Sequence, residues 1–208
     1  MQTRRRSFAL ALVLATALAQ GFAARATDTP SGAAKLSWLG QSCFLLETAS
    51  GTRVLMDPIP SGLGYDPPMG LRADLVTVSH EHGDHNFVAL AGGKPRILRG
   101  LTADKKGWNK INEKVKDVSV RAVGVYHDDD GGKKRGLNTV LVFATGGLPI
   151  AHLRDLGHTL SDEQISALGS IDVLLVPVGG TFTIDAQQAQ RVVDQIRPRL
   201  VVVPMHYK

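Results

Sequence analysis

The chain has 208 residues, among them 24 lysine and arginine residues, 19 aspartate and glutamate residues and one cysteine. This length suits a single domain that buries a sizeable core, and a composition with 43% hydrophobic residues excludes a disordered polypeptide. The single cysteine, Cys43, excludes an internal disulfide, and its place in an apolar run favours a buried, inert thiol over a nucleophile or a metal ligand.

The first 26 residues have the layout of a secretory signal peptide. Arginines at 4–6 precede an apolar run at 8–19, and positions 24–26 offer a small-x-small cleavage pattern. The run is short for a permanent membrane span. We therefore expect a mature domain, 27–208, that is periplasmic or secreted and has no stable membrane span. The arginine pair at 5–6 leaves both the general secretory route and the twin-arginine route open.

Removal of this segment changes the net charge of the protein. Four of the 24 basic residues lie in it and none of the 19 acidic residues does, so the mature domain is close to neutral. The sequence pI of about 9.5 is therefore mostly a targeting feature. It gives no evidence for a nucleic-acid surface, and we expect no nucleic-acid partner.

The N-terminal half predicts a meander of strands followed by mixed elements. Gly40 and the Ser50-Gly51 turn separate short apolar runs, as in strands joined by hairpin-length turns. In chain order we expect strands at 35–39, 42–47 and 52–56, a long loop at 58–73, a strand at 75–78, a short helix after position 86, a strand at 95–98 and a short amphipathic helix at 105–116.

The C-terminal half predicts alternating strands and helices. Ser161 with Gln164, and Asp185 with Gln188, have the pattern of helix-capping pairs. In chain order we expect a strand at 118–126, a charged loop at 128–136, a hairpin of strands at 138–144 and 149–153, a helix at 161–168, a strand at 173–176, a helix at 185–196 and a strand at 200–203. These elements predict an α/β layered domain with mixed sheets inside and helices outside.

Residues that bind metals stand at the ends of four predicted strands. The stretch VSHEHGDHN at 78–86 follows one strand, and the remaining candidates follow three others. The candidates are His80, His82, Asp84, His85, His127, His152, Asp155 and His206. Because strand ends that meet at one edge commonly build sites in α/β folds, we predict a metal site there.

The spacing within this stretch suggests two metal ions. His80 and His82 are two positions apart, so in an extended segment they point the same way and reach one metal. Asp84 and His85 lie a turn further on and suit a second ion, with Gly83 allowing the bend. A closed structural zinc site is disfavoured because such sites favour cysteine.

The pattern His80-x-His82-x-Asp84-His85 resembles the HxHxDH signature of the metallo-β-lactamase-fold hydrolases. Stretches at 38–42 and 55–58 resemble the opening strands of that superfamily. Stretches at 151–157, 176–180 and 203–207 resemble a branch that includes ascorbate-6-phosphate lactonase-like and N-acyl-phosphatidylethanolamine phospholipase D-like proteins. The resemblance implies a four-layer αββα sandwich of two mixed β-sheets with helices outside.

The resemblance also implies a role for each candidate ligand. The first metal would be held by His80, His82 and His127, and the second by Asp84, His85 and His206, with Asp155 bridging both. Asp84 would also act catalytically by handling a proton. The cofactors would be two divalent metal ions, with zinc as first choice and manganese or iron as alternatives. A metal-bound hydroxide would cleave an ester, lactone or phosphodiester bond of a small-molecule substrate.

Five further residues are candidates for contact with the ligands or the substrate. For His152, strand alternation favours support of the site or a core position over ligation, and His158 is either an exposed polar residue or part of the rim. Asp57 either hydrogen-bonds a ligand histidine or caps a turn. Arg135 either contacts an anionic substrate group or belongs to a surface turn, and Arg154 stands where relatives often have glycine, so it would crowd the site or bind an anion.

Some alternatives remain open at this stage. The acidic run at 128–130 is expected to be solvated rather than an extra metal site. The chain stops two residues after His206, where relatives usually continue, so the domain is expected either to lack a C-terminal segment or to complete its pocket from elsewhere. The rival functions are a non-catalytic periplasmic metal-binding protein of the same fold and a phosphodiesterase or nuclease. The sequence gives no oligomeric state.

Overall fold

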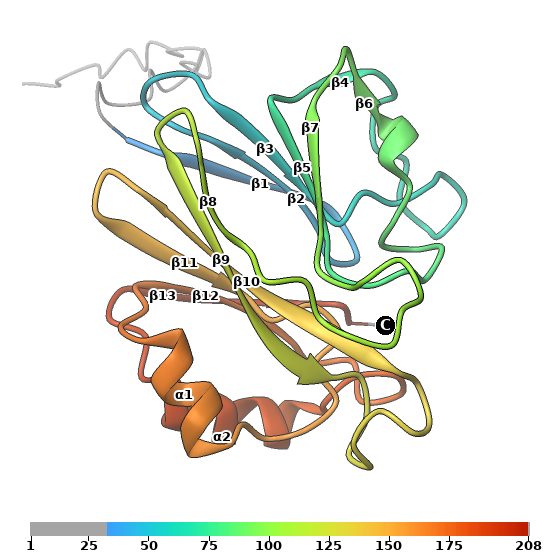
Figure 1. The fold of residues 1–208 in the computed structure, drawn as a ribbon, viewed down its shortest axis with the longest axis vertical. Helices are drawn as coiled ribbons and strands as arrows, with labels where there is room; N and C mark the ends of the chain where they lie inside the picture. Colours follow the sequence, from blue (N-terminus) through green and yellow to red (C-terminus); the bar gives the residue numbers. More distant parts are fainter. Residues whose placement is uncertain (1–32, 208) are drawn as a thin grey trace, which may run out of the picture.

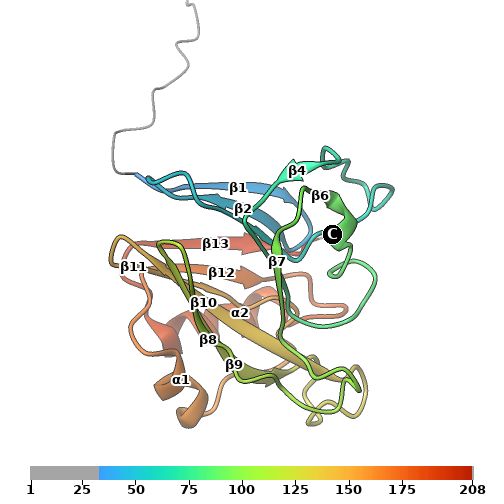
Figure 2. The same ribbon diagram turned by 45° about the horizontal axis from the view of Figure 1, so that its top comes forward.

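The computed structural model describes residues 33–207, so the predicted signal segment at 1–26 lies outside the described residues. Two β-sheets face each other, and two helices lie against the outer side of one of them (Figures 1 and 2). Within 33–207, no helix has the length and apolar character that crossing a membrane would require.

The first sheet has five strands in the order β1-β2-β3-β5-β7. Their bounds are β1 Lys35–Gly40, β2 Cys43–Glu47, β3 Arg53–Met56, β5 Leu75–Val78 and β7 Arg96–Arg99. The first three strands form an antiparallel meander, and β3, β5 and β7 run parallel. A separate parallel pair, β4 (Leu71–Arg72) and β6 (Ala91–Gly92), lies beside the 3-10 helix η1 (Val88–Leu90).

The second sheet has six strands in the order β13-β12-β11-β10-β9-β8. Their bounds are β8 Asn112–Val115, β9 Val118–Tyr126, β10 Leu137–Thr145, β11 Leu148–His152, β12 Val173–Pro177 and β13 Val201–Met205. Strands β8 to β11 are antiparallel, and β11, β12 and β13 run parallel. The mixed character expected from the sequence is therefore confirmed for both sheets.

Both predicted capping pairs begin a helix. Helix α1 (Asp162–Leu168) starts after Ser161, and helix α2 (Ala186–Ile196) starts after Asp185. In each, the cap side chain accepts from the backbone N–H three residues on, and that residue's side chain accepts from the cap in return. These reciprocal bonds satisfy amide groups that a helix start leaves unpaired, which is why both starts could be predicted.

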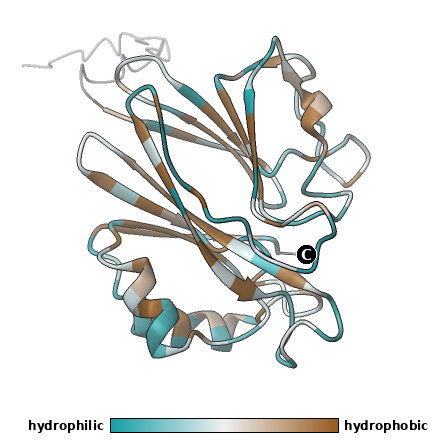
Figure 3. Ribbon diagram, viewed as in Figure 1, coloured by the Kyte–Doolittle hydropathy of each residue, from teal (hydrophilic) through white to brown (hydrophobic). Residues whose placement is uncertain are grey.

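Alternation along the strands divides the apolar side chains into three layers, and the strand interiors are correspondingly hydrophobic (Figure 3). In β10, Val140 and Val142 face the helices, whereas Leu141 and Phe143 face the other sheet. The outer side of the five-stranded sheet is covered by the loop after β3 and by η1, with Ile59 and Leu90 packed there. The expected helical layer is thus present on one side, while on the other the described residues contribute a loop and a 3-10 turn.

The predicted helix at 105–116 is wrong. Residues 112–115 form strand β8, which pairs antiparallel with β9 through a tight turn at Lys116 and Asp117. Ile111 and Val115 contribute to the apolar layer between the sheets. Pairing with the edge of β9 gives hydrogen-bond partners to the backbone groups of this polar segment and buries its few apolar side chains. The tertiary context therefore overrides a weak helical pattern.

Candidate metal centre

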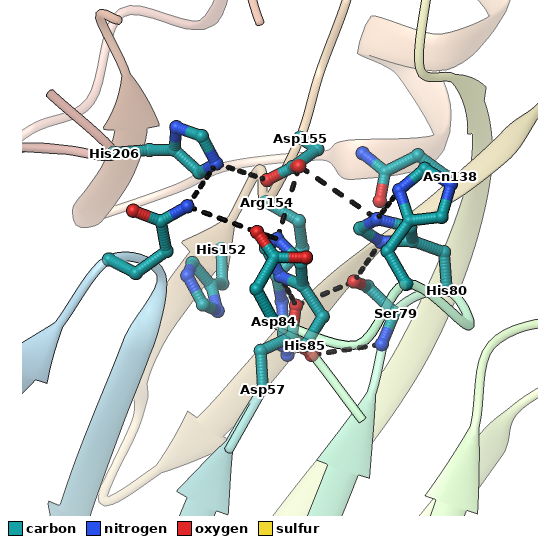
Figure 4. Close-up of polar contacts among 12 residues, drawn as sticks. Asp57, Ser79, His80, Asp84, His85, Asn138, His152, Arg154, Asp155 and His206 are labelled. Carbon is teal, nitrogen blue, oxygen red and sulfur yellow. Dashed lines mark hydrogen bonds and ion pairs between the residues drawn. The ribbon is translucent and has the colours of Figure 1, made fainter. Parts of the chain in front are cut away.

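Polar side chains that follow strands β3, β5, β9, β11 and β13 meet at one edge of the two facing sheets, and Figure 4 shows several of them together. Asp57 follows β3, and the stretch from Ser79 to His85 follows β5. In the second sheet, His127 follows β9, Asp155 lies just beyond β11 and His206 follows β13. The edge predicted from strand ends is therefore where these side chains meet.

The candidate ligands form two groups of three. Ligand atoms within each group lie within 4.8 Å of one another: His80, His82 and His127 in one, and Asp84, His85 and His206 in the other. These are the two sets that the sequence resemblance implied. His80 Nε2 lies 3.1 Å from His82 Nδ1, so the two rings approach each other through atoms that can both face one metal.

Asp155 lies between the two groups. Its Oδ2 is 3.1 Å from His127 Nε2, 3.1 Å from His85 Nε2 and 3.8 Å from His80 Nε2. Its Oδ1 is 3.4 Å from His206 Nε2. One carboxylate therefore reaches imidazoles of both groups, which is the position that a bridging ligand needs.

The donor set fits divalent metal ions. Within the described part of the chain, His85 Nε2 and Asp155 Oδ1 are buried and have no hydrogen-bond partner. Buried polar atoms are normally paired, and the contacts of these two are with other candidate ligands: His85 Nε2 lies 3.1 Å from Asp155 Oδ2, and Asp155 Oδ1 lies 3.4 Å from His206 Nε2. A bound cation would complete such a donor set. Imidazoles and carboxylates are the ligands that zinc, manganese and iron accept, whereas magnesium and calcium prefer oxygen alone.

The protonation states of the ligands depend on one another. Burial lowers the pKa of His80 well below its usual range, and the charge of His85 adds to this, which favours the neutral imidazole that a metal ion would need. Burial also disfavours a charged His85, but the carboxylates of Asp155 and Asp57 outweigh it and raise its pKa to about 10. Burial would raise the pKa of Asp155, yet His85, His127 and His206 hold it well below its usual range. A metal at the second group must therefore displace a proton from His85.

Asp57 fixes the orientation of two ligand histidines. It is fully buried, and its Oδ2 lies 3.0 Å from His85 Nδ1. The same oxygen accepts the Ser79 hydroxyl at 2.5 Å, and that hydroxyl is 2.8 Å from His80 Nδ1. With their Nδ1 atoms engaged in this way, both histidines would have Nε2 free for a metal ion. Of the two roles considered for Asp57, the contact with a ligand histidine is the one the structure shows.

Arg154 lies beneath the ligands rather than in their cleft. Its side chain is fully buried, forms an ion pair with Asp57 and donates from Nη2 to Thr77 Oγ1 at 3.0 Å. Its backbone has a φ of 58°, in the left-handed region that normally favours glycine. The expectation that it crowds the site or binds a substrate anion is wrong, because this φ turns the side chain inward to Asp57.

The other weaker candidates have different positions. His152 is fully buried against Phe44 and the sulfur of Met205, so it is a core residue. His158 holds a loop, because its Nε2 accepts from the backbone N–H of Tyr126 at 3.0 Å. Arg135 lines the cleft above the ligands and is treated further below.

The acidic run at 128–130 is only partly solvated. Asp128 is buried, and its carboxylate accepts backbone N–H groups of Asp130, Gly132, Lys134 and Arg135. Burial would raise its pKa, but these four amide groups lower it to about 2. Asp128 therefore anchors its own loop, whereas Asp129 and Asp130 are exposed, as expected.

Gln41 was not recognised from the sequence. It occupies the turn between β1 and β2, where its Nε2 lies 3.1 Å from Asp84 Oδ2 and 2.8 Å from His206 Nε2. The backbone carbonyl oxygen of Gln41 also accepts the backbone N–H of His206 at 3.3 Å. In the sequence, Gln41 is marked as a polar residue in a turn at the end of a predicted strand. This position points to the site only after the structure shows that β1 ends there.

A cleft of about 360 Å³ opens over the ligands. It is lined by His82, Asp84, His127, Lys134, Arg135, Asp155, Phe182 and His206. Glycine is required in the wall of an adjoining cleft of about 230 Å³, because a Cβ atom on Gly179 would lie 2.3 Å from the backbone carbonyl oxygen of His206. Four implied ligands of both metal groups and the bridging Asp155 thus face a space large enough for a small molecule.

Comparison with known proteins finds one family model that covers the domain. The model, described as the β-lactamase superfamily domain, matches residues 35–206. A UPF0173 protein of Pyrococcus abyssi is 31% identical over 83% of this chain and 83% of its own length. A UPF0173 metal-dependent hydrolase of Anaeromyxobacter sp. (strain K) is 31% identical, covering 85% of this chain and 75% of its own length.

Solved structures give the same result. A Thermotoga maritima protein described as a Zn-dependent hydrolase of the metallo-β-lactamase superfamily has 35% identity and a TM-score of 0.65. The match covers 85% of this chain and 77% of that one. A metallo hydrolase from Ignicoccus hospitalis has a TM-score of 0.65 at 23% identity, which supports the fold alone.

Proposed function

The chain belongs to the β-lactamase superfamily domain family, and on this basis we propose that it is a hydrolase that works with two divalent metal ions. The observation that carries the proposal is Asp155, whose single carboxylate reaches the imidazoles of both ligand groups. A shared carboxylate is of use when two ions must lie close together. The narrower branch named from the sequence stays a prediction, because the name UPF0173 specifies no substrate.

The metal ions, when bound, would activate a water molecule and stabilise the negative charge that develops on a carbonyl or phosphoryl oxygen. The protein's own contribution is to hold the ligands in one geometry. Asp57 does so for the two histidines whose Nδ1 atoms it engages directly or through Ser79. We propose an ester, a lactone or a phosphodiester of a small molecule as the substrate.

Asp84 is the residue we assign to proton transfer. Its side chain is 33% exposed and lines the cleft, whereas Asp155 is 3% exposed. The amide of Gln41 donates to Asp84 Oδ2 and limits its rotation. A carboxylate that is fixed at one oxygen and open to the cleft can take a proton from the attacking water and pass it to the leaving group.

Metal analysis combined with hydrolysis assays tests this function. Purified mature protein should bind up to two ions per chain and hydrolyse at least one lactone, ester or phosphodiester probe. A chelator should remove the activity, zinc should restore it, and Asp84→Asn should reduce it. Full metal occupancy in the double variant His80→Ala/Asp155→Ala would contradict the ligand assignment.

The alternative function, a non-catalytic metal-binding protein of the same fold, predicts a different result. One premise of this alternative was that Arg154 impairs catalysis, but Arg154 is buried beneath the candidate ligands and paired with Asp57. A metal-storage protein would bind two ions and show no chelator-sensitive hydrolysis of any probe. The open cleft over Asp84 favours the enzyme, because a storage site gains nothing from a space for substrate.

We also propose that the protein is exported. The support is the order of arginines, apolar run and small residues within positions 1–26. Cell fractionation followed by N-terminal sequencing should find a chain that begins near Thr27 outside the cytoplasm. A chain that begins at Met1 in the exported fraction would exclude cleavage.

A further inference from the structure

The cleft above the metal centre has two unlike sides. On one side, Lys134 and Arg135 of the loop at 128–136 contribute positive charge. A second cleft of about 200 Å³ beside His80 is lined by Arg135, Lys105 and Glu81, and the carboxylate of Glu81 is already ion-paired with Arg99. A third cleft of about 230 Å³ shares Phe182 and His206 with the main cleft. Its lining, Gln41, Gly179, Thr181, Phe182 and His206, includes no lysine or arginine.

Arg135 is held in place before any ligand arrives. Its backbone N–H donates to the buried carboxylate of Asp128 at 2.7 Å, and its Nη2 donates to the carbonyl oxygen of Thr181 at 3.0 Å. Its guanidinium carbon lies 5.7 Å from the centre of the Phe182 ring. A long side chain fixed at its backbone, at its tip and over an aromatic ring loses little freedom when it binds a ligand.

The charge of Arg135 is not balanced by a neighbour. Within residues 33–207 it forms no ion pair, whereas Lys134 is paired with Asp129 at 2.7 Å. The acidic residues of the main cleft, Asp84 and Asp155, are metal ligands, so bound cations would neutralise them. Arg135 also retains N–H donors that no hydrogen bond within the described chain uses, in the fork that matches a carboxylate or a phosphate.

Phe182 supplies an apolar surface beside this charge. Phe182 is 58% exposed and lines both of the clefts that His206 lines. Aromatic side chains commonly line ligand clefts, where they pack against apolar parts of the bound molecule. The ring and the guanidinium of Arg135 therefore form one continuous contact surface for a molecule that has both an anionic and an apolar part.

We propose that the substrate carries an oxyanion, a carboxylate or a phosphate, that binds Arg135, and an apolar or aromatic part that packs on Phe182. The bond to be cleaved lies over the metal ligands, and the oxyanion extends toward the loop at 128–136. This inference rests on the proposed hydrolase function and names the class of substrate for that site. Arg135 is a residue that selects the substrate, and it is distinct from the ligands that perform the reaction.

Two esters with the same leaving group test the oxyanion. The zinc-loaded protein is assayed with 4-nitrophenyl acetate, which is neutral, and with the 4-nitrophenyl monoester of glutarate, which adds a carboxylate. Arg135→Gln should lower the ratio of kcat/KM for the anionic over the neutral ester about fivefold, through KM, which is the size expected for one partly exposed charge pair. Metal occupancy should not change.

Lys133→Gln is the matched control. Lys133 is in the same loop and is ion-paired with Asp130, but its side chain is 76% exposed and does not line the cleft. This variant changes the charge of the loop by the same amount and should leave the ratio between the esters as it is. Equal effects of the two variants would mean that general electrostatic attraction, and not contact with Arg135, discriminates between the esters, which would overturn the proposal.

Calorimetric titration separates this proposal from the hydrolase function. Benzoate and phenyl phosphate should bind the zinc-loaded protein more weakly in Arg135→Gln than in Lys133→Gln, and the probe with the larger difference identifies the oxyanion. Phe182→Ala should weaken benzoate more than acetate. If no ester is hydrolysed but binding depends on Arg135, the hydrolase function fails and the subsite stands. If binding and hydrolysis are both insensitive to Arg135, the subsite is overturned.

Discussion

The base and the rim of the metal centre are built in opposite ways. The base consists of Asp57, Thr77, Ser79 and Arg154, all buried and joined by hydrogen bonds and an ion pair. The rim consists of Lys134, Arg135 and Phe182, which line the open cleft. Groups that orient ligands must be rigid and dry, whereas groups that contact a substrate must stay accessible. We therefore expect base variants to alter metal binding and rim variants to alter substrate preference.

The largest effect should follow loss of Asp155, the residue on which the two ligand groups converge. Asp155→Ala removes the carboxylate that reaches His85, His127 and His206. Metal affinity should fall by more than the roughly 100-fold that loss of an outer partner costs, and hydrolysis should fall with it. Competition with a chromophoric chelator measures the affinity of both ions. Loss of only one ion would show that Asp155 does not bridge.

Asp57→Asn tests whether the base controls metal binding. The amide cannot accept from His85, Ser79 and Arg154 as the carboxylate does, so metal affinity should fall about 10- to 100-fold. Because Arg154 is left buried without a countercharge, the free energy of unfolding should fall by about 3–5 kcal/mol. Urea denaturation of the metal-free protein measures this change. Arg135→Gln is the rim control, and a similar loss of metal affinity there would remove the distinction.

Arg154→Gly separates the role of the guanidinium from that of the backbone. Glycine suits the φ of 58°, so the substitution introduces no backbone strain. It nevertheless leaves the buried Asp57 without the guanidinium, and we expect the free energy of unfolding to fall by about 3–5 kcal/mol, together with weaker metal binding. Arg154→Lys should restore part of the metal affinity if a positive charge beneath Asp57 is what matters. Unchanged metal binding in the glycine variant would assign Arg154 no part in the base.

Arg197→Gly is the matched control for that experiment. Arg197 ends helix α2 with a φ of 52°, and it is exposed and lines none of the clefts at the candidate ligands. Glycine at this left-handed cap should raise stability slightly, by about 0.5–1 kcal/mol, and leave metal affinity unchanged. Thermal and urea unfolding of the two variants side by side would show whether a glycine at a positive φ acts through the backbone alone.

The smallest effect should come from Asp128→Asn. This substitution should make the loop at 128–136 less rigid without changing a residue that lines the cleft. Asp128 accepts four backbone N–H groups, and an asparagine side chain can accept through one oxygen only. Arg135 should become less well positioned, so KM for the anionic ester should rise about twofold to threefold while metal affinity stays the same. Steady-state kinetics with both esters measures the change, and a fall in metal occupancy would place Asp128 with the base instead.

Local spacing made part of the site predictable. The stretch from His80 to His85 is six residues long, so its geometry follows from the short segment after β5. His127 and His206 were found because each directly follows an apolar strand that the sequence marks clearly. The helix starts at Ser161 and Asp185 were predictable for the same reason, because a cap acts over three residues.

Features that depend on packing were not predictable. The segment at 105–116 has a weak helical pattern, and only the edge of β9 makes part of it a strand. Gln41 and Arg154 lie at positive φ, so the direction of their side chains does not follow from strand alternation. Gln41 thereby meets Asp84, which is 43 residues away, and Arg154 turns toward Thr77, which is 77 residues away.

The sequence by itself predicted the candidate metal ligands and the class of fold. Ligand chemistry and strand patterning are local properties, and the order of residues expresses them directly. The tertiary structure alone decided that Arg154 supports Asp57 from below while Arg135 faces the cleft. Both arginines are close to a candidate ligand in sequence, and they differ in their burial and in the residues they contact. Burial and contacts depend on which distant strands and loops pack around each side chain, and the sequence alone does not predict that packing.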